Sequence, residues 1–285
     1  MTVLALAVGG RGLVEPDEPV LYADDEAFLR SRGAFETTRV YDGRPFKVDE
    51  HLARLAGSAE RVAIGPIDAD ELRSLANEAL EAAQAPEAVL RFFVTPGRDG
   101  AARPTTIAMV STLPPGLEEM REHGARLVSI QLGLDPTVRA SAPWLLGGVK
   151  STSYAVNMAA EAEAKRRGAD DAVFLGSGDI VLEGPVTNVW WRLTRVLYTP
   201  ALELGILAGV TRATLVSEAA RLGYEVREGV FPLEHMAGAE EAFTSSSVRE
   251  VMPAVELDGM PIGPGRPGSA ARDLQEALRA AAAAP

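Results

Sequence analysis

A lysine that follows two glycines is the first residue whose surroundings suggest chemistry. Lys150 lies in the segment Gly147-Gly-Val-Lys-Ser-Thr-Ser-Tyr154, and the pattern after it predicts a helix over 153–167. A lysine just before a helix N-terminus is poorly placed as a cation, because the helix dipole repels positive charge there. The same field favours the neutral amine, the form that makes Schiff bases with carbonyl compounds. A solvated lysine is the alternative interpretation.

A glutamate at the end of an apolar strand is the second candidate. Glu183 stands in Val181-Leu-Glu-Gly-Pro-Val-Thr-Asn188, after a strand predicted over 180–183 and before a Gly-Pro turn. A carboxylate in this place could hold the nitrogen of a pyridine ring protonated, which makes the ring an electron sink. A turn glutamate that faces water is the alternative.

Two further segments have the features of an anion site. Leu207-Ala-Gly-Val-Thr-Arg212 leads into a helix predicted over 211–222, with Thr211 as its expected N-cap. Backbone N–H groups at a helix start bind phosphate well. Thr244-Ser-Ser-Ser247 follows a predicted strand and offers hydroxyl and backbone donors to an anion. Ordinary helix capping and a polar loop are the alternatives.

The elements that must position these residues divide at Pro114-Pro-Gly116, which predicts a linker over 114–120. Residues 1–113 are expected to form a small α+β domain. Its hairpin turns at Asp42-Gly43 and returns over 45–48, and Asp49 then caps a helix. The other predicted elements of this domain are strands over 3–8, 34–41, 89–95 and 106–110 and a helix over 70–83.

The helix after Asp49 has an apolar stripe, which predicts the face that packs on the sheet. Arg54 adjoins this stripe without belonging to it, so it could point toward a phosphate. A surface ion pair is the alternative for Arg54. The stripe consists of Leu52, Leu55, Ala56, Ala59 and Val62.

Residues 121–285 are expected to form a larger domain of short strands and helices. Its first strand is predicted over 125–132, and a strand over 241–244 leads into the serine-rich loop. An alanine-rich helix begins near Ala270. Further short strands are predicted over 172–175, 180–183, 189–191 and 196–199.

Composition excludes several classes of function. The net charge of -12 and the pI of about 4.9 repel nucleic acid and anionic membranes, so neither is expected as a partner. The chain has no cysteine, which removes thiolate zinc sites and cysteine nucleophiles. His51, His123 and His235 are far apart, and no metal site is expected. The N-terminus lacks the basic start of a signal peptide, and we expect a cytoplasmic protein.

Five segments, taken in order, resemble the class IV aminotransferases, the fold-type IV enzymes that use pyridoxal 5'-phosphate (PLP). The resemblance covers nearly the whole chain. Residues 33–62 are similar to the family's N-terminal segment, whose helix supplies a phosphate-binding arginine. The other four are GVKSTSYAVN (148–157, the Schiff-base segment), LEGPVTNVWW (182–191, the Glu-x-x-x-x-Asn signature), GILAGVTR (205–212) and AFTSSSVREVMPAVELDG (242–259), the last two being phosphate loops.

The resemblance implies a fold, a cofactor and a set of site residues. The implied fold is α+β, with a small N-terminal α+β domain and a larger C-terminal β-barrel-like domain with helices, assembled as a homodimer. The implied cofactor is PLP, with Lys150 as the catalytic residue that holds it as a Schiff base and moves a proton on the substrate. The implied cofactor-binding residues are Arg54, Lys150, Tyr154, Glu183, Asn188, Val210, Thr211, Ser246 and Ser247, and the implied substrate-binding residues are Phe35, Thr37, Arg91 and Arg98.

The sequence separates the members of this family poorly. Lys-Ser-Thr-Ser-Tyr and Phe35-Glu-Thr-Thr-Arg39 look most like the aminodeoxychorismate lyases and their transaminase relatives. The Lys-x-Gly-Gly-Asn-Tyr of branched-chain enzymes and the Arg-x-His of D-amino-acid enzymes are absent, although Arg98 or Arg103 could bind a carboxylate. We expect an aminotransferase that acts on an amino acid or primary amine and a 2-oxo acid. A pyruvate-releasing lyase, a PLP protein without catalysis and a phosphate-binding protein without PLP are the alternatives.

Overall fold

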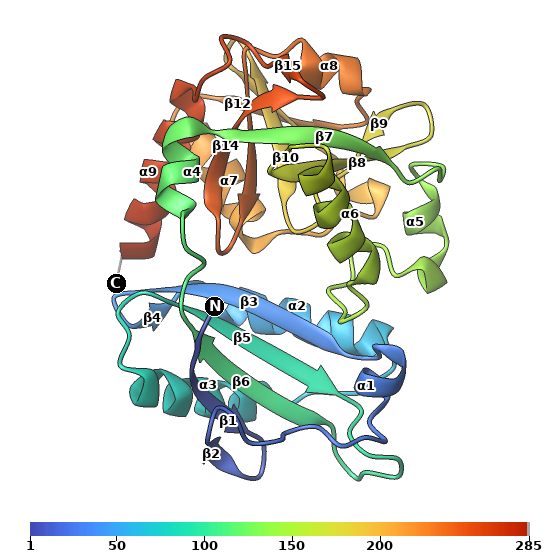
Figure 1. Ribbon diagram of the computed structural model, residues 1–285, viewed down its shortest axis with the longest axis vertical. Coiled ribbons are helices and arrows are strands. Elements are labelled where there is room, and N and C mark those ends of the chain that lie inside the picture. Colours follow the sequence, from blue (N-terminus) through green and yellow to red (C-terminus); the bar gives the residue numbers. More distant parts are fainter. Residues whose placement is uncertain (284–285) are drawn as a thin grey trace. The chain divides into compact units, whose positions relative to one another are not determined.

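The structure is a computed structural model that describes residues 1–283, and the chain forms two compact units (Figure 1). The first unit holds residues 1–115 and 149–154, and the second holds residues 116–148 and the chain from 155 onward. Lys150 therefore belongs to the first unit, whereas the sequence analysis placed it in the second domain. No helix in the described part of the chain is both long and apolar enough to cross a membrane.

The first unit is an antiparallel sheet with helices on one face (Figure 1). The strand order is β2-β1-β6-β5-β3-β4. The elements of this unit are β1 Val3–Val8, β2 Gly12–Val14, α1 Glu26–Arg30, β3 Ala34–Tyr41, β4 Arg44–Pro45, α2 Val48–Arg61, α3 Ala69–Ala83, β5 Ala88–Thr95 and β6 Thr105–Ser111.

The core of the first unit lies between α2 and α3 and one face of this sheet. Successive strand residues point to opposite faces, so Leu90, Phe92 and Val94 of β5 face the helices while Arg91 and Phe93 face away. This alternation gives the sheet a second, partly exposed face that carries polar and aromatic side chains.

Two expectations for the start of α2 were wrong. The strand that returns from the hairpin is β4, Arg44–Pro45, and does not reach residue 48. The helix begins at Val48 after Lys47 in the left-handed conformation, so Asp49 lies inside its first turn and is not the N-cap. Ala56 is exposed, whereas the rest of the predicted stripe is buried or partly buried. Lys47 adopts a left-handed conformation at this corner (φ +51), which no local pattern in the sequence marked.

The second unit contains a mixed sheet with helices around it, so the expected α+β class is confirmed. Its elements are α4 Leu117–His123, β7 Ala125–Gln131, α5 Val138–Ser141, a 3-10 helix Pro143–Leu145, α6 Ala155–Arg166, β8 Asp171–Gly176, β9 Ile180–Val181, β10 Asn188–Leu193, β11 Val196–Pro200, a 3-10 helix Leu202–Leu204, α7 Val210–Arg221, β12 Glu225–Gly229, α8 Leu233–Ala237, β13 Glu241–Ser246, β14 Glu250–Leu257, β15 Met260–Pro261 and α9 Ser269–Ala283.

The sheet of the second unit curls until its two ends are joined. The strand order is β12-β11-β10-β13-β14-β7-β8-β9, with β15 added to β14. The segment after β12 bonds to β9: Val181 N donates to Phe231 O at 2.9 Å, and Leu233 N donates to Asp179 O at 2.8 Å. These bonds link β9 to the segment that follows β12 and give the curled sheet the barrel-like character that the resemblance implied.

Candidate functional site

Lys150 lies along an open edge of β3. β4 pairs with β3 only at residues 40 and 41, which leaves the first half of this edge to another segment. Phe35 N donates to Lys150 O at 3.0 Å, and Ser151 forms a bridge with Ala34. The backbone of residues 149–152 thus extends the sheet locally, and this pairing explains why the segment belongs to the first unit.

The amine of Lys150 lies over aromatic rings of the first unit. Its Nζ is 4.4 Å from the ring centroid of Phe35 and 5.8 Å from that of Tyr154. The two rings meet edge to face, with centroids 5.1 Å apart. Rings on two sides restrict the rotamers of a partly buried lysine, so the amine is held in a defined place.

The helix-dipole argument for Lys150 is not supported. The helix begins at Ala155 rather than at the expected Ser153, and the dipole acts only within about the first turn of a helix. The positive charges of Arg54 and Lys150 both act on His51 and help to lower its pKa, after the larger effect of burial.

Arg54 is bound to a buried glutamate that the sequence analysis missed. Its Nε donates to Glu36 Oε1 at 2.6 Å and its Nη2 donates to Glu36 Oε2 at 2.8 Å. His51 Nδ1 donates to the same Oε2 at 2.7 Å. Glu36 and His51 are buried, and Arg54 is nearly so. A charged residue among the helix-facing positions of strand 34–41 was the signal that could have revealed this network.

The network keeps Glu36 ionised. Burial alone would raise the pKa of its carboxyl, but the bonds from Arg54 and His51 and their charges lower it from 4.5 to about 2. Burial lowers the pKa of His51, with Glu36 opposing this effect and the charges of Arg54 and Lys150 adding to it. A bidentate carboxylate fixes the plane of a guanidinium, so Glu36 sets the orientation of Arg54.

The other face of the first sheet carries three of the four predicted substrate residues, Phe35, Thr37 and Arg91. Thr37 stands opposite Arg91 in the register of β3 and β5, and Phe35 stacks on Phe93 with ring centroids 6.0 Å apart. Burial lowers the pKa of Arg91, whose guanidinium donates to Ser111 Oγ at 2.8 Å. Among the described residues no carboxylate forms an ion pair with Arg91.

Arg98 has a different environment. It lies in the exposed loop between β5 and β6, where its Nε donates to Asp24 at 3.3 Å and its guanidinium lies over the ring of Tyr22. Arg91 is therefore partly buried and has no carboxylate partner among the described residues, whereas Arg98 is exposed and already pairs with a carboxylate.

Glu183, in the second unit, has both carboxylate oxygens bonded. Arg139 Nη1 donates to Oε1 and Leu207 N donates to Oε2, each at 2.9 Å. The sequence analysis did not select Arg139, which lies in a short helix with no motif of its own. The carboxylate is thus tied to the segment that leads into α7.

Asn188 is hydrogen-bonded to the same segment, the one that leads into α7. Its Nδ2 donates to Leu207 O at 2.9 Å, and a Cβ on Gly209 would lie only 2.2 Å from its Oδ1. The N-cap of α7 is Gly209, without a side-chain hydrogen bond, so the expected cap at Thr211 was wrong. Val210 and Thr211 instead occupy the first turn, where backbone N–H groups point toward a potential anion.

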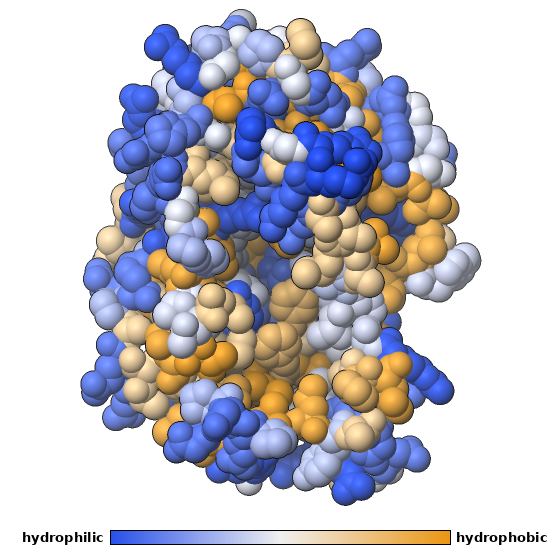
Figure 2. Space-filling model, in the orientation of Figure 1, coloured by the Kyte–Doolittle hydropathy of each residue, from blue (hydrophilic) through white to orange (hydrophobic). Residues whose placement is uncertain are grey.

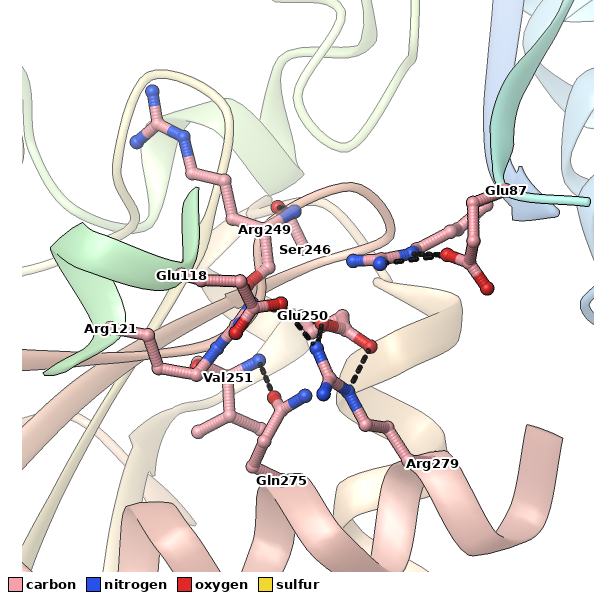
Figure 3. Close-up of polar contacts among 10 residues, drawn as sticks. Glu87, Glu118, Arg121, Ser246, Arg249, Glu250, Val251, Gln275 and Arg279 are labelled. Atoms are coloured by element: carbon pink, nitrogen blue, oxygen red, sulfur yellow. Dashed lines mark hydrogen bonds and ion pairs between the residues drawn. The ribbon is translucent and has the colours of Figure 1, made fainter. Parts of the chain in front are cut away.

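The loop that carries Ser246 and Ser247 is followed by a buried glutamate, Glu250, whose carboxylate is bound by arginines (Figure 3). Ser246 Oγ accepts from Arg249 N at 3.2 Å. Glu250, fully buried and with φ +58, accepts from Arg121 of α4 at 2.9 Å and from Arg279 of α9 at 3.2 and 3.0 Å. Two helices therefore hold the residue at which the loop turns into β14.

Replacing Arg121 by alanine is expected to destabilise the second unit by about 3 kcal/mol, because a buried charge loses one of its partners. Arg121 also donates to the carbonyl oxygens of Arg249 and Val251. Urea unfolding of the variant would measure the loss. Arg126→Ala, which breaks an exposed ion pair with Asp170, is the matched control and should cost much less, because exposed ion pairs contribute little to stability. Equal midpoints for the two variants would contradict the buried role of Arg121.

The predicted residues therefore form two groups, one on each unit. Lys150 in the first unit has Phe35 and Tyr154 beside its amine and shares the neighbourhood of His51 with Arg54. In the second unit, Glu183 and Asn188 meet at Leu207, two residues before the N-cap of α7. Ser246 and Ser247 lie in the loop between β13 and β14, partly buried.

The chain is similar to proteins of known sequence and structure over almost its full length. A family model described as amino-transferase class IV matches residues 33–257. The bifunctional aminodeoxychorismate lyase / D-amino acid transaminase of Mycobacterium tuberculosis is 32% identical over 87% of this chain and 89% of its own. The D-alanine aminotransferase of Bacillus licheniformis is 28% identical over 94% and 93%.

The chain is also similar over almost its full length to solved structures of aminotransferases. A hypothetical aminotransferase from Mycobacterium tuberculosis in an alpha-ketoglutarate and PMP bound form superposes with a TM-score of 0.92, at 31% identity and with 98% of each chain covered. A fold IV-transaminase, CpuTA1, from Curtobacterium pusillum has a TM-score of 0.88 at 33% identity, with 95% of this chain and 91% of that chain covered.

Proposed function

Because the chain belongs to the class IV aminotransferase family, we propose that it moves an amino group from an amino acid or primary amine to a 2-oxo acid, with Lys150 as the catalytic amine. The chain has the fold-type IV architecture, and it is a PLP-dependent transaminase. The role of Lys150 is supported by the position of its amine. Its Nζ lies 4.4 Å from the ring centroid of Phe35, on a segment that is hydrogen-bonded to β3.

The residues present fit the cofactor. The first turn of α7 follows a glycine N-cap with no side-chain acceptor, which suits a phosphate. Arg54 is oriented by Glu36, and Glu183 presents a bonded carboxylate suited to a protonated pyridine nitrogen. Bound PLP supplies an aldehyde that captures amines and a ring that withdraws electrons from the substrate carbon.

Each residue then has a task in the proposed reaction. Lys150 would hold the cofactor through its aldehyde and would move a proton at the substrate carbon. Arg54 in the first unit, and Val210, Thr211, Ser246 and Ser247 in the second, would each offer hydrogen-bond donors to a phosphate. Glu183 would keep the ring nitrogen protonated and Tyr154 would contact the cofactor, while Asn188 holds the segment before α7 through Leu207.

A donor and acceptor screen tests the function. Purified protein loaded with PLP is offered D-amino acids, L-amino acids and (R)-amines, each with pyruvate or 2-oxoglutarate. We expect amino-group transfer to the 2-oxo acid, in line with the neighbour whose structure holds alpha-ketoglutarate. A yellow protein that is inert toward every amine would contradict the proposal and favour a PLP protein without catalysis.

A lyase activity is the second candidate, and it is favoured by the relatives. The aminodeoxychorismate lyase of Bacillus subtilis is 30% identical over 94% of this chain, and the Mycobacterium tuberculosis relative carries both activities in its name. The assay is pyruvate release from aminodeoxychorismate. Release without any 2-oxo acid acceptor would identify the lyase, since a transaminase needs the acceptor to turn over.

Arg91 is our proposed carboxylate-binding residue. A partly buried guanidinium without a carboxylate partner gains a charge-assisted pair when a substrate carboxylate binds. Arg91→Met is expected to raise KM for the 2-oxo acid about 10- to 100-fold, the value of a hydrogen bond to a charged group. Since such binding is the same in the ground and transition states, kcat should change little.

Steady-state kinetics of Arg91→Met and Arg98→Met compare the two arginines directly. Arg98 already pairs with Asp24 in an exposed loop, so its replacement should leave KM unchanged. A larger effect at Arg98 than at Arg91 would transfer the proposed role to the loop.

We also propose that the protein is a homodimer. The second unit exposes large apolar side chains at its α5 end, where Figure 2 shows a hydrophobic patch. Trp144 is 79% exposed, and Val156 and Met158 at the start of α6 are 63% and 60% exposed. Apolar groups of this size are usually covered by a partner surface. Sedimentation at micromolar concentration should give twice the 30.2 kDa mass of the chain.

A further inference from the structure

The guanidinium of Arg139 has one ion-pair partner among the described residues, and that partner is Glu183. The two side chains are 20% and 12% exposed, so the pair is largely shielded from water. Leu207 N donates to the other oxygen of the same carboxylate. A carboxylate bonded through both oxygens has its plane and its rotamer defined, whereas a turn glutamate facing water samples several.

The backbone of Arg139 is itself held closely by two glycines. A Cβ on Gly147 would lie 2.6 Å from the carbonyl oxygen of Arg139, and a Cβ on Gly205 would lie 2.7 Å from its Cβ. No side chain fits at either place. Gly147 lies shortly before Lys150 in the chain, and Gly205 precedes Leu207. The helix α5 is only four residues long, so this close packing, and not the helix, holds Arg139.

We infer that Arg139 is a positioning residue that orients and charge-stabilises Glu183 for the ring nitrogen of the cofactor. The inference rests on the proposed function, because it assumes that Glu183 meets that nitrogen. A guanidinium keeps its charge at every accessible pH, so it stabilises the ionised carboxylate beside it. Partners that orient a liganding side chain in this way commonly control the affinity of the group that it binds.

The alternative is that Arg139 only supports the fold of the loop at 205–207. The two roles differ in one chemical respect. A positioning role through Glu183 acts on the ring nitrogen alone, whereas a supporting role would disturb every contact that the cofactor makes near α7. A cofactor analogue without the ring nitrogen separates them.

The experiment measures the dissociation constants of PLP and of 1-deazapyridoxal 5'-phosphate, in which C–H replaces the ring nitrogen. Apoprotein is titrated with each, by absorbance and by quenching of tryptophan fluorescence. Arg139→Met removes the charge and keeps the length of the side chain. Arg166→Met, on the exposed arginine that pairs with Glu163, is the matched control in the same unit.

For Arg139→Met we expect PLP to bind about 10- to 100-fold more weakly, and the deaza analogue to bind as it does to the natural chain. In a Glu183→Gln background, Arg139→Met should cause no additional loss of PLP affinity, because the two residues act as one unit. Equal losses for both cofactors, or additive losses in the double variant, would overturn the inference.

Two further measurements keep the outcomes distinct. The melting temperature of each apoprotein shows whether Arg139→Met still folds. If it does not, Arg139→Gln, which also removes the charge, is used in its place. Arg139→Lys should recover part of the PLP affinity, and a Lys variant no better than the Met variant would contradict a charge-based role. Failure of the natural chain to bind PLP would instead refute the proposed function.

Discussion

Replacing Lys150 by alanine is expected to reduce transamination by at least about 10³-fold, because both the Schiff base and the proton transfer depend on this amine. The absorbance band of the lysine-bound cofactor should disappear at the same time. Spectra of PLP-loaded protein and single-turnover assays with an amine donor provide the two measurements. A variant that kept the band and the activity would refute the assignment of Lys150.

The sequence offers matched controls for this experiment. Its lysines are Lys47, Lys150 and Lys165 and no others. Lys47 lies before α2 and pairs with Glu50, and Lys165 is exposed in α6. Alanine at either position should leave the band and the rate unchanged. Borohydride reduction of loaded protein, followed by peptide mass analysis, should place the cofactor on Lys150 alone.

Replacing Glu36 by glutamine is expected to destabilise the protein by about 3 to 5 kcal/mol, because the buried His51 and Arg54 lose the carboxylate that they share. Affinity for PLP should fall as well, since Arg54 loses its orientation, whereas affinity for pyridoxal, which has no phosphate, should not. Urea unfolding of the apoprotein and cofactor titrations measure the two effects. A glutamine variant with natural stability and natural PLP affinity would show that the network serves neither purpose.

An exposed ion pair provides the control within the same unit. Glu87 pairs with the buried Arg39 and is unsuitable as an exposed pair, so the control is Glu50→Gln: Glu50 and its partner Lys47 are 51% and 36% exposed, and its replacement should cost less than about 1 kcal/mol.

The same network predicts how stability depends on pH. Folding lowers the pKa of Glu36 from 4.5 to about 2. The stability that the ionised Glu36 contributes is therefore fully present above pH 4.5 and is lost as the pH falls toward 2. A shift of this size corresponds to about 3 kcal/mol. The pKa of His51 is also lowered, by burial, so the folded state resists its protonation and stability starts to fall below pH 6.5.

Unfolding free energies at pH 7.5, 5.5, 4 and 3 would follow this decline in the natural chain. The Glu36→Gln variant should lose less stability over the acid part of this range, since the titrating carboxyl is gone. Identical slopes for both proteins would show that other groups control the acid sensitivity.

Most elements were predictable because their signals are local. The strand Ala34–Tyr41 and the strand Val3–Val8 have the predicted bounds, and the alanine-rich C-terminal helix begins within a residue of the expected start. Alternation and helical periodicity depend on neighbours a few residues apart. The short helices α1, α4, α5 and α8 were not predicted, because helices of this length depend on tertiary contacts more than on their own sequence.

The predictions that proved wrong concern the starts of helices, where the chain turns and the N-cap is chosen. The helix after the hairpin begins at Val48, and α7 is capped by Gly209 instead of Thr211. At Gly209 the deciding factor is the amide of Asn188, which leaves no room for a side chain. Such steric limits come from residues distant in the chain, so no local rule could reveal them.

The sequence by itself determined the types and order of the reactive groups: a lysine after two glycines, a glutamate after an apolar strand, and two segments rich in anion donors. Only the tertiary structure decided their partners. Arg139 meets Glu183, and Glu36 meets Arg54 and His51, across separations in the chain that propensity and spacing cannot bridge. The physical reason is that charge and orientation at a buried site are set by whichever polar groups packing brings together.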